Sequence, residues 1–141
     1  MSIWSLVYTS VASRKMTDAD LKRILEVSRR KNQDKLVTGM LLYMDPFFIQ
    51  ALEGELQSLE QAFDTIKTDA RHEKVTIVYK QPIKERLFPN WSMGFNKFEQ
   101  SHLGKIEGLN DFLQRPASEF LVESSNRVLE LLNMFRREIL F

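Results

Sequence analysis

Apolar and polar residues follow two different periods along the chain. In residues 3–10 they alternate, with β-branched and aromatic side chains on both faces, which predicts a strand. A helix is predicted over about residues 18–31, because apolar residues recur there at helical spacing after a capping-box-like start at Thr17 and Asp20. A second amphipathic helix is predicted from the spacing of Leu56, Leu59, Phe63 and Ile66.

The remaining β-like runs complete a recognisable order of elements. Residues 36–44 and 47–53 are joined by a short turn that contains Pro46 and predict a hairpin, and further strands are expected at 75–83 and 91–98. The order βαββαβ with an added strand predicts an α+β fold, a ferredoxin-like sandwich. In that fold a five-stranded mixed sheet carries two helices on one face, and the first and third strands are adjacent and central.

The composition changes after Gly104. Apolar residues recur at helical spacing between residues 118 and 140, and Pro116 separates them from a shorter helical run. We therefore expect residues 1–98 to form the main domain and residues 99–141 to form a C-terminal helical cap. The apolar face of this cap would cover the free face of the sheet or form an oligomer interface.

Composition narrows the function classes. The chain has 141 residues and no Cys, and its 20 Lys and Arg against 19 Asp and Glu disfavour electrostatic capture of nucleic acid. The missing thiols exclude disulfides, thiolate zinc sites and Cys nucleophiles. Neither His72 nor His102 lies in a zinc motif, and no phosphate-binding glycine loop or hydrolase elbow occurs, so neither a metal site nor an enzyme is expected. With no apolar run long enough to span a membrane and no secretory signal, a cytoplasmic protein is predicted.

One amide interrupts the apolar pattern of the predicted hairpin. On alternation, Gln50 shares a face with Phe48 and Leu52, and a buried amide without partners costs about 1–3 kcal/mol. Tyr8 occupies the analogous place on the first strand, so the simplest arrangement pairs Tyr8 with Gln50. Taken alone, this pattern favours a satisfied polar pair that fixes the strand register.

A series of motifs lies in a fixed order along residues 1–98. Each motif alone is weak, but their combination and spacing are highly specific and indicate more than a polar pair that fixes the strand register. They are Leu6-Val7-Tyr8-Thr9-Ser10, Asn32, Val37-Thr38-Gly39-Met40-Leu41-Leu42-Tyr43, Phe48, Gln50-Ala51-Leu52-Glu53-Gly54, Asp69-Ala70-Arg71-His72 and Phe88-Pro89-Asn90-Trp91-Ser92-Met93. Together they resemble the BLUF family of flavin-binding blue-light sensors. The resemblance identifies residues 1–98 as the flavin-binding domain and implies a flavin, usually FAD, with FMN or riboflavin as alternatives.

The resemblance also implies where the flavin lies. Its ring would sit between the two helices, against the sheet face that carries Tyr8 and Gln50. Ile24 and Ile66 match the aliphatic side chains that sandwich the ring, although both are equally typical of helix core. The other cofactor-binding residues that it implies are Lys31, at a position where relatives often carry Asn, and Asn32, Phe48, Asp69, Arg71 and His72.

These polar residues have simpler explanations too. Asn32 matches the amide that binds the carbonyl and imide edge of the flavin, but Asn is also common at the end of a helix. Asp69, Arg71 and His72 match the segment near the ring and the ribityl or phosphate portion, but a solvated charged loop would contain the same residues.

The resemblance implies a photocycle without a covalent adduct. An electron and then a proton leave Tyr8, and the radical pair recombines after the Gln50 side chain has rotated or tautomerised. Because an amide has a donor end and an acceptor end, this change creates a new hydrogen-bond pattern. Trp91 and Met93 belong to the photoactive set, since in this family they exchange places or shift near the Gln; ordinary core packing is the alternative for Trp91.

The expected function is therefore a non-catalytic photoreceptor. Its signal would be read out through self-association, a separate downstream signalling protein or both, without direct contact with nucleic acid or a membrane. The main alternative is a ferredoxin-like regulatory domain that binds a metabolite or protein without photochemistry. A third is a small acyl or phosphoryl hydrolase, for which Arg14 is present but a Gly-rich cradle is missing.

Overall fold

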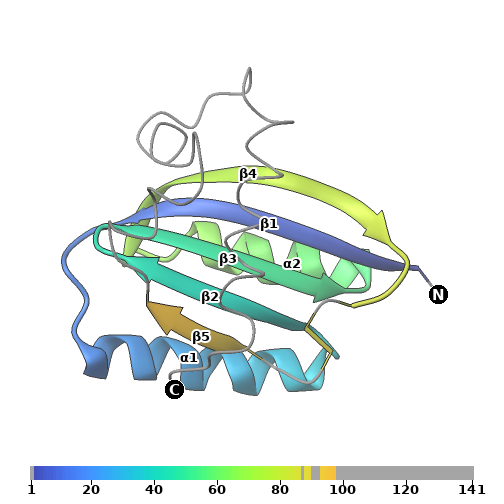
Figure 1. The fold of residues 1–141 in the computed structure, drawn as a ribbon, viewed down its shortest axis with the longest axis horizontal. Helices are drawn as coiled ribbons and strands as arrows, with labels where there is room; N and C mark the ends of the chain where they lie inside the picture. Colours follow the sequence, from blue (N-terminus) through green and yellow to red (C-terminus); the bar gives the residue numbers. More distant parts are fainter. Residues whose placement is uncertain (1, 87, 90–92, 98–141) are drawn as a thin grey trace.

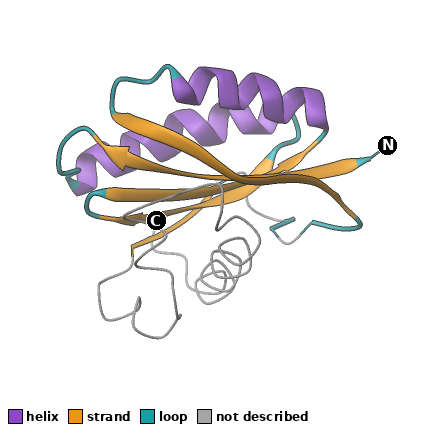
Figure 2. Ribbon diagram, turned by 90° about the horizontal axis from the view of Figure 1, so that it is seen from above, coloured by secondary structure: helices purple, strands orange, loops and turns teal. Residues whose placement is uncertain are grey.

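The computed structural model describes residues 2–86, 88–89 and 93–97, and these form one sheet with two helices on one of its faces (Figures 1 and 2). The elements are β1 (Ile3–Ala12), α1 (Asp18–Asp34), β2 (Thr38–Met44), β3 (Phe47–Gly54), α2 (Leu56–Lys67), β4 (His72–Ile83) and β5 (Gly94–Lys97). The strand order is β4-β1-β3-β2-β5. Neighbours pair antiparallel except β5, which runs parallel to β2.

The predicted α+β fold with antiparallel strands and two helices is confirmed, and β1 and β3 are adjacent as expected. The two inner pairings of the sheet, β1 with β3 and β3 with β2, are regular along their length. The pairing of β1 with β4 is interrupted twice, between Val7 and Tyr8 and between Thr9 and Val11. The predicted helical cap, residues 99–141, lies outside the described residues.

Three predicted boundaries were wrong by three residues, and others, such as the end of β1 and the start of β2, by two or fewer. Helix α1 continues to Asp34 and ends in a Schellman motif, in which the backbone N–H of Val37 donates to the Asn32 carbonyl at 2.9 Å and Leu36 has a φ of 55°. Strand β4 begins at His72 because its first residues already pair with the end of β1.

The last boundary concerns β5, which was expected to include both Trp91 and Met93. Pairing with β2 starts at Gly94, so Met93 precedes the strand. Trp91 itself lies outside the described residues.

The capping box at the start of α1 is confirmed. The backbone N–H of Asp20 donates to the Thr17 hydroxyl at 3.1 Å, and the Thr17 N–H donates to the Asp20 carboxylate at 2.9 Å. The same carboxylate binds Arg14 at 2.7 Å. Arg14, the cation that a hydrolase would need for anion binding, is therefore paired with Asp20 at the start of α1.

The core between the helices and the sheet contains the residues that the pattern placed there. Leu21 and Leu25 of α1 and Leu59 of α2 are at most 1% exposed, and each contributes about 1.5–3 kcal/mol by burial. They pack on the sheet face that carries Leu6, Tyr8, Leu41, Phe48 and Leu52. The opposite face is also buried, with Val7, Met40, Leu42 and Ile49 at 0% exposure.

Gly39 is required by the close approach of β2 and β3. A Cβ at this position would lie 2.0 Å from the Ala51 carbonyl oxygen, a backbone atom that cannot move aside. Within the described part of the chain no helix combines the length and the apolar character needed to cross a membrane.

Candidate functional site

Tyr8 and Gln50 are directly opposite each other on β1 and β3, as predicted. The Tyr8 hydroxyl donates a hydrogen bond to Gln50 Oε1, and Gln50 Nε2 lies 3.4 Å from the Met93 sulfur, to which it donates. Tyr8 and Gln50 are 3% and 4% exposed. Both ends of the amide are therefore engaged inside the protein, the oxygen by a phenol and the nitrogen by a thioether.

The environment keeps Tyr8 protonated. Burial raises the pKa of the Tyr8 phenol far above its usual value, and the nearby Asp69 carboxylate raises it further. A neutral phenol can donate its proton to Gln50, whereas a phenolate could not. In this structure the hydrogen bond runs from the Tyr8 hydroxyl to the amide oxygen of Gln50.

A cavity of about 70 Å³ opens beside this pair, between the two helices and the sheet. Its walls are Tyr8, Ile24, Ser28, Leu41, Phe48, Gln50, Ile66, Asp69, Arg71 and His72. A second cavity of about 90 Å³ shares part of this lining and follows α1 past Lys31 and Asn32 to Lys35.

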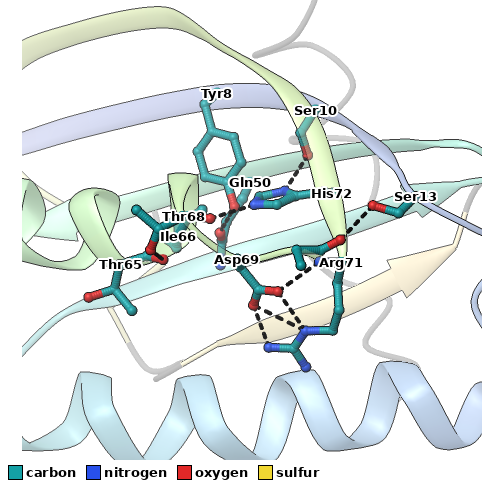
Figure 3. Close-up of polar contacts among 11 residues, drawn as sticks. Tyr8, Ser10, Ser13, Gln50, Thr65, Ile66, Thr68, Asp69, Arg71 and His72 are labelled. Carbon is teal, nitrogen blue, oxygen red and sulfur yellow. Dashed lines mark hydrogen bonds and ion pairs between the residues drawn. The ribbon is translucent and has the colours of Figure 1, made fainter.

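His72 forms a rigid wall of the cavity (Figure 3). Its Nε2 lies 2.6 Å from the Ile66 carbonyl oxygen and its Nδ1 lies 2.8 Å from the Ser10 hydroxyl. Because a carbonyl can only accept, Nε2 carries a proton and donates to Ile66. The ring meets Tyr8 and Phe48 edge to face, each at a centroid distance of 6.3 Å.

The charged part of the site is a pair of residues between α2 and β4. The Asp69 carboxylate accepts from the Arg71 guanidinium at 2.5 and 3.0 Å and from the Arg71 backbone N–H at 2.9 Å (Figure 3). Hydrogen bonds from Arg71 lower the pKa of Asp69, and its burial only partly opposes them. The pair therefore stays ionised, with its charges compensated at the cavity wall.

The structure places every predicted cofactor residue against one cavity or the other. Lys31 and Asn32 line only the second, and the remaining ones line the first. Asn32 is 6% exposed and lies within α1, whose C-cap is Lys35, so the explanation of Asn32 as a helix C-cap was wrong. His72 belongs to β4, so the segment is only partly the solvated loop of the alternative explanation.

Sequence reasoning missed several residues of the site, among them Ser28, Leu41 and Arg29. Ser28 lies one turn after Ile24 on α1, and Leu41 is the cross-strand partner of Gln50, so helical spacing and strand register could have found them. Arg29 donates from Nε to the Met93 carbonyl oxygen at 2.9 Å. No periodicity predicts that contact, because a side chain meets a backbone atom far along the chain.

Comparison with known proteins shows which family this chain belongs to. The family model described as BLUF, sensors of blue-light using FAD, matches residues 3–94. The chain belongs to the BLUF family. The model covers more than half of the chain and includes each described residue of the site.

Relatives of the BLUF domain include proteins with further domains. The chain is 32% identical over 120 residues to the photoactivated adenylate cyclase subunit beta of Euglena gracilis, covering 84% of this chain but only 14% of that protein. It resembles the dark-state structure of BlrB, a BLUF protein, at 28% identity and a TM-score of 0.69, covering 91% and 95% of the two chains. It also resembles the ground-state structure of BlsA, at 29% identity and a TM-score of 0.74, covering 95% of this chain and 87% of the BlsA chain.

The chemistry of the cavity fits a flavin. An isoalloxazine ring is flat and apolar on its faces, and Ile24 and Ile66 bring aliphatic groups to the cavity from the two helices. Its carbonyl and imide edge needs hydrogen-bonding groups, which the amides of Asn32 and Gln50 can supply. The site therefore provides both kinds of surface that the family's cofactor requires.

Proposed function

We propose that this chain is a blue-light sensor that binds FAD between α1 and α2 and stores the light signal in the hydrogen bonds of Tyr8 and Gln50. The observation that carries the proposal is the buried Tyr8–Gln50 bond beside a cavity lined from both helices. The ring would lie between Ile24 and Ile66. FMN and riboflavin are the alternative flavins.

Other residues would hold the rest of the cofactor. The amide of Asn32 would bind the carbonyl and imide edge of the ring, with Lys31 next to it on the same cavity wall. Phe48 and His72 would close the end of the site near Tyr8. Asp69 and Arg71 would lie near the ribityl or phosphate portion, where Arg71 offers a cation.

When bound, the flavin would absorb blue light and accept an electron. Tyr8 would be the donor, because it is the buried phenol at the cavity wall, and its proton would pass along the existing hydrogen bond to Gln50 Oε1. The Gln50 amide would then rotate or tautomerise before Tyr8 recovers its electron and proton. A changed set of donors and acceptors would remain until the side chain relaxes in the dark.

The signal would leave the site through the segment that contains Met93, together with Trp91. We propose that residues 1–98 are the sensory domain and that residues 99–141 form a helical extension above a five-stranded mixed sheet. A partner protein or a second copy of the chain would read the altered packing. We assign no catalytic step to this domain, and a cytoplasmic location stays a prediction.

The test is the visible spectrum of the purified protein before and after blue light. We expect oxidised-flavin absorption, a small red shift on illumination and full reversal in the dark, and heat release of the cofactor identifies the flavin. A colourless protein, or a yellow one without a reversible shift, would contradict the proposal. The second outcome would favour a regulatory domain without photochemistry.

A further inference from the structure

Met93 connects Gln50 to helix α1 through two different groups. Its sulfur accepts from Gln50 Nε2 at 3.4 Å, and its backbone carbonyl accepts from Arg29 Nε at 2.9 Å. Met93 is 1% exposed and comes immediately before β5, which begins at Gly94 and pairs with β2. One residue therefore contacts the amide through its side chain and helix α1 through its main chain.

The two contacts differ in strength. A thioether is a weak acceptor, and the unbranched Met side chain has three rotatable bonds, so the sulfur does little to hold itself beside the amide. The bond from a guanidinium to a carbonyl is charge-assisted and shorter, and it fixes backbone instead of a flexible side chain. Arg29 is thus the firmer of the two anchors.

The helix that carries Arg29 is well anchored in the protein. Helix α1 has a capping box at its start and buries Leu21 and Leu25, which are 1% and 0% exposed. Arg29 lies one turn after Leu25, and its neighbour Arg30 points elsewhere, to Glu26 at 3.3 Å with a side chain that is 71% exposed. The helix therefore presents two adjacent arginines, of which one binds the Met93 carbonyl and the other has an exposed ion pair.

We propose that Arg29 is a positioning residue of the light switch, which holds the Met93 carbonyl so that the Met93 sulfur stays within reach of the Gln50 amide nitrogen. This inference rests on the function proposed above. A sulfur can accept from the amide N–H₂ group but has nothing to donate to an amide oxygen, so the contact favours the Gln50 orientation that the structure contains. Arg29 keeps that preference in place.

The first test concerns Met93 directly and needs no photocycle. In the full chain, kept dark and labelled with ¹³C at the methionine methyl groups, the NMR signal of Met93 is assigned by its loss in Met93→Leu. Arg29→Gln should move and broaden this signal, and Arg30→Gln, the matched control on the same helix, should leave it unchanged. An unmoved Met93 signal in Arg29→Gln would overturn the proposal, and equal thermal midpoints of the variants would exclude unfolding as the cause of a change.

The second test measures dark recovery. Without its anchor, Met93 has to be ordered again before Gln50 regains its partner, so Arg29→Gln should slow recovery by about fivefold, the factor of a 1 kcal/mol change. In the Met93→Leu background, where the sulfur is missing, Arg29→Gln should change the rate by less than about twofold. Arg29→Lys, which keeps a cationic donor, should recover much of the wild-type rate.

The outcomes separate this inference from the proposed function. An equal effect of Arg29→Gln in both backgrounds, or recovery that is unchanged or faster, would refute the positioning role while the photocycle itself stands. A wild-type protein without a photocycle would refute the proposed function. The NMR test would still show whether Arg29 holds Met93.

Discussion

Removing both partners of the Tyr8–Gln50 hydrogen bond should cost less stability than the two single removals added together. Gln50→Leu leaves the Tyr8 hydroxyl, in a residue only 3% exposed, without its acceptor, and Tyr8→Phe leaves Gln50 Oε1 without its donor. Each orphaned group costs about 1–3 kcal/mol when buried. The double variant leaves neither group orphaned, so its free energy of unfolding should exceed the additive value by the sum of the two costs, about 2–6 kcal/mol.

The assay is urea unfolding of the four proteins in the dark, followed by far-UV circular dichroism, at one saturating concentration of FAD because a ligand of the native state adds to stability. Tyr79→Phe is the matched control. The Tyr79 hydroxyl binds Ser5, not Gln50, so its combination with Gln50→Leu should be additive. If Tyr8→Phe and Gln50→Leu are also additive, the hydrogen bond contributes nothing and the reasoning is refuted.

Three further predictions use other measurements. Gln50→Leu should retain flavin absorption but lose the light-induced red shift, because packing is kept while the two-ended amide is gone; an undiminished shift in the visible spectrum would refute its role. Gly39→Ala should destabilise the fold by more than about 2 kcal/mol in urea titrations, because its Cβ would meet the Ala51 carbonyl oxygen at 2.0 Å, and a neutral result would contradict that geometry. Arg71 lowers the pKa of Asp69 below its usual value of 3.8, so the ion pair adds stability above that pH, and this stability is lost as the pH falls through the pKa of Asp69 in the folded protein. Asp69→Asn should therefore flatten the fall in the free energy of unfolding between about pH 5 and 2. An unchanged dependence of this free energy on pH would exclude the ion pair as its source.

How far the sequence predicted the site depends on the kind of contact. The pairing of Tyr8 with Gln50 follows from alternation within each strand, because strand register places whole faces opposite each other. The ends of α1 and β4 were missed because they depend on backbone hydrogen bonds from Val37 and on pairing with β1, which residue type does not reveal. The Arg29 contact depends on tertiary structure alone, since any residue offers the same carbonyl.

For the charged residues of the site, too, the sequence predicted the residues but not their contacts. The Asp69–Arg71 motif was visible in the sequence, but its pairing was not, since spacing alone does not distinguish an internal ion pair from two groups that face a ligand. The orientation of His72 was equally hidden. It depends on one carbonyl from α2 and one hydroxyl from β1, which only the packed structure brings together.

The two interruptions in the pairing of β1 with β4 have a mechanical consequence. They lie on either side of the Tyr8–Thr9 dipeptide, whereas the pairing of β1 with β3 is regular through the same residues. Such an irregularity disrupts the hydrogen-bond ladder locally, so β4 is less tightly coupled to β1 at these residues than β3 is. Within β4, His72 meets the Tyr8 ring and has to be kept, whereas residues 74–83 are the part of the sheet that a chimaera should exchange to leave the Tyr8–Gln50 geometry in place.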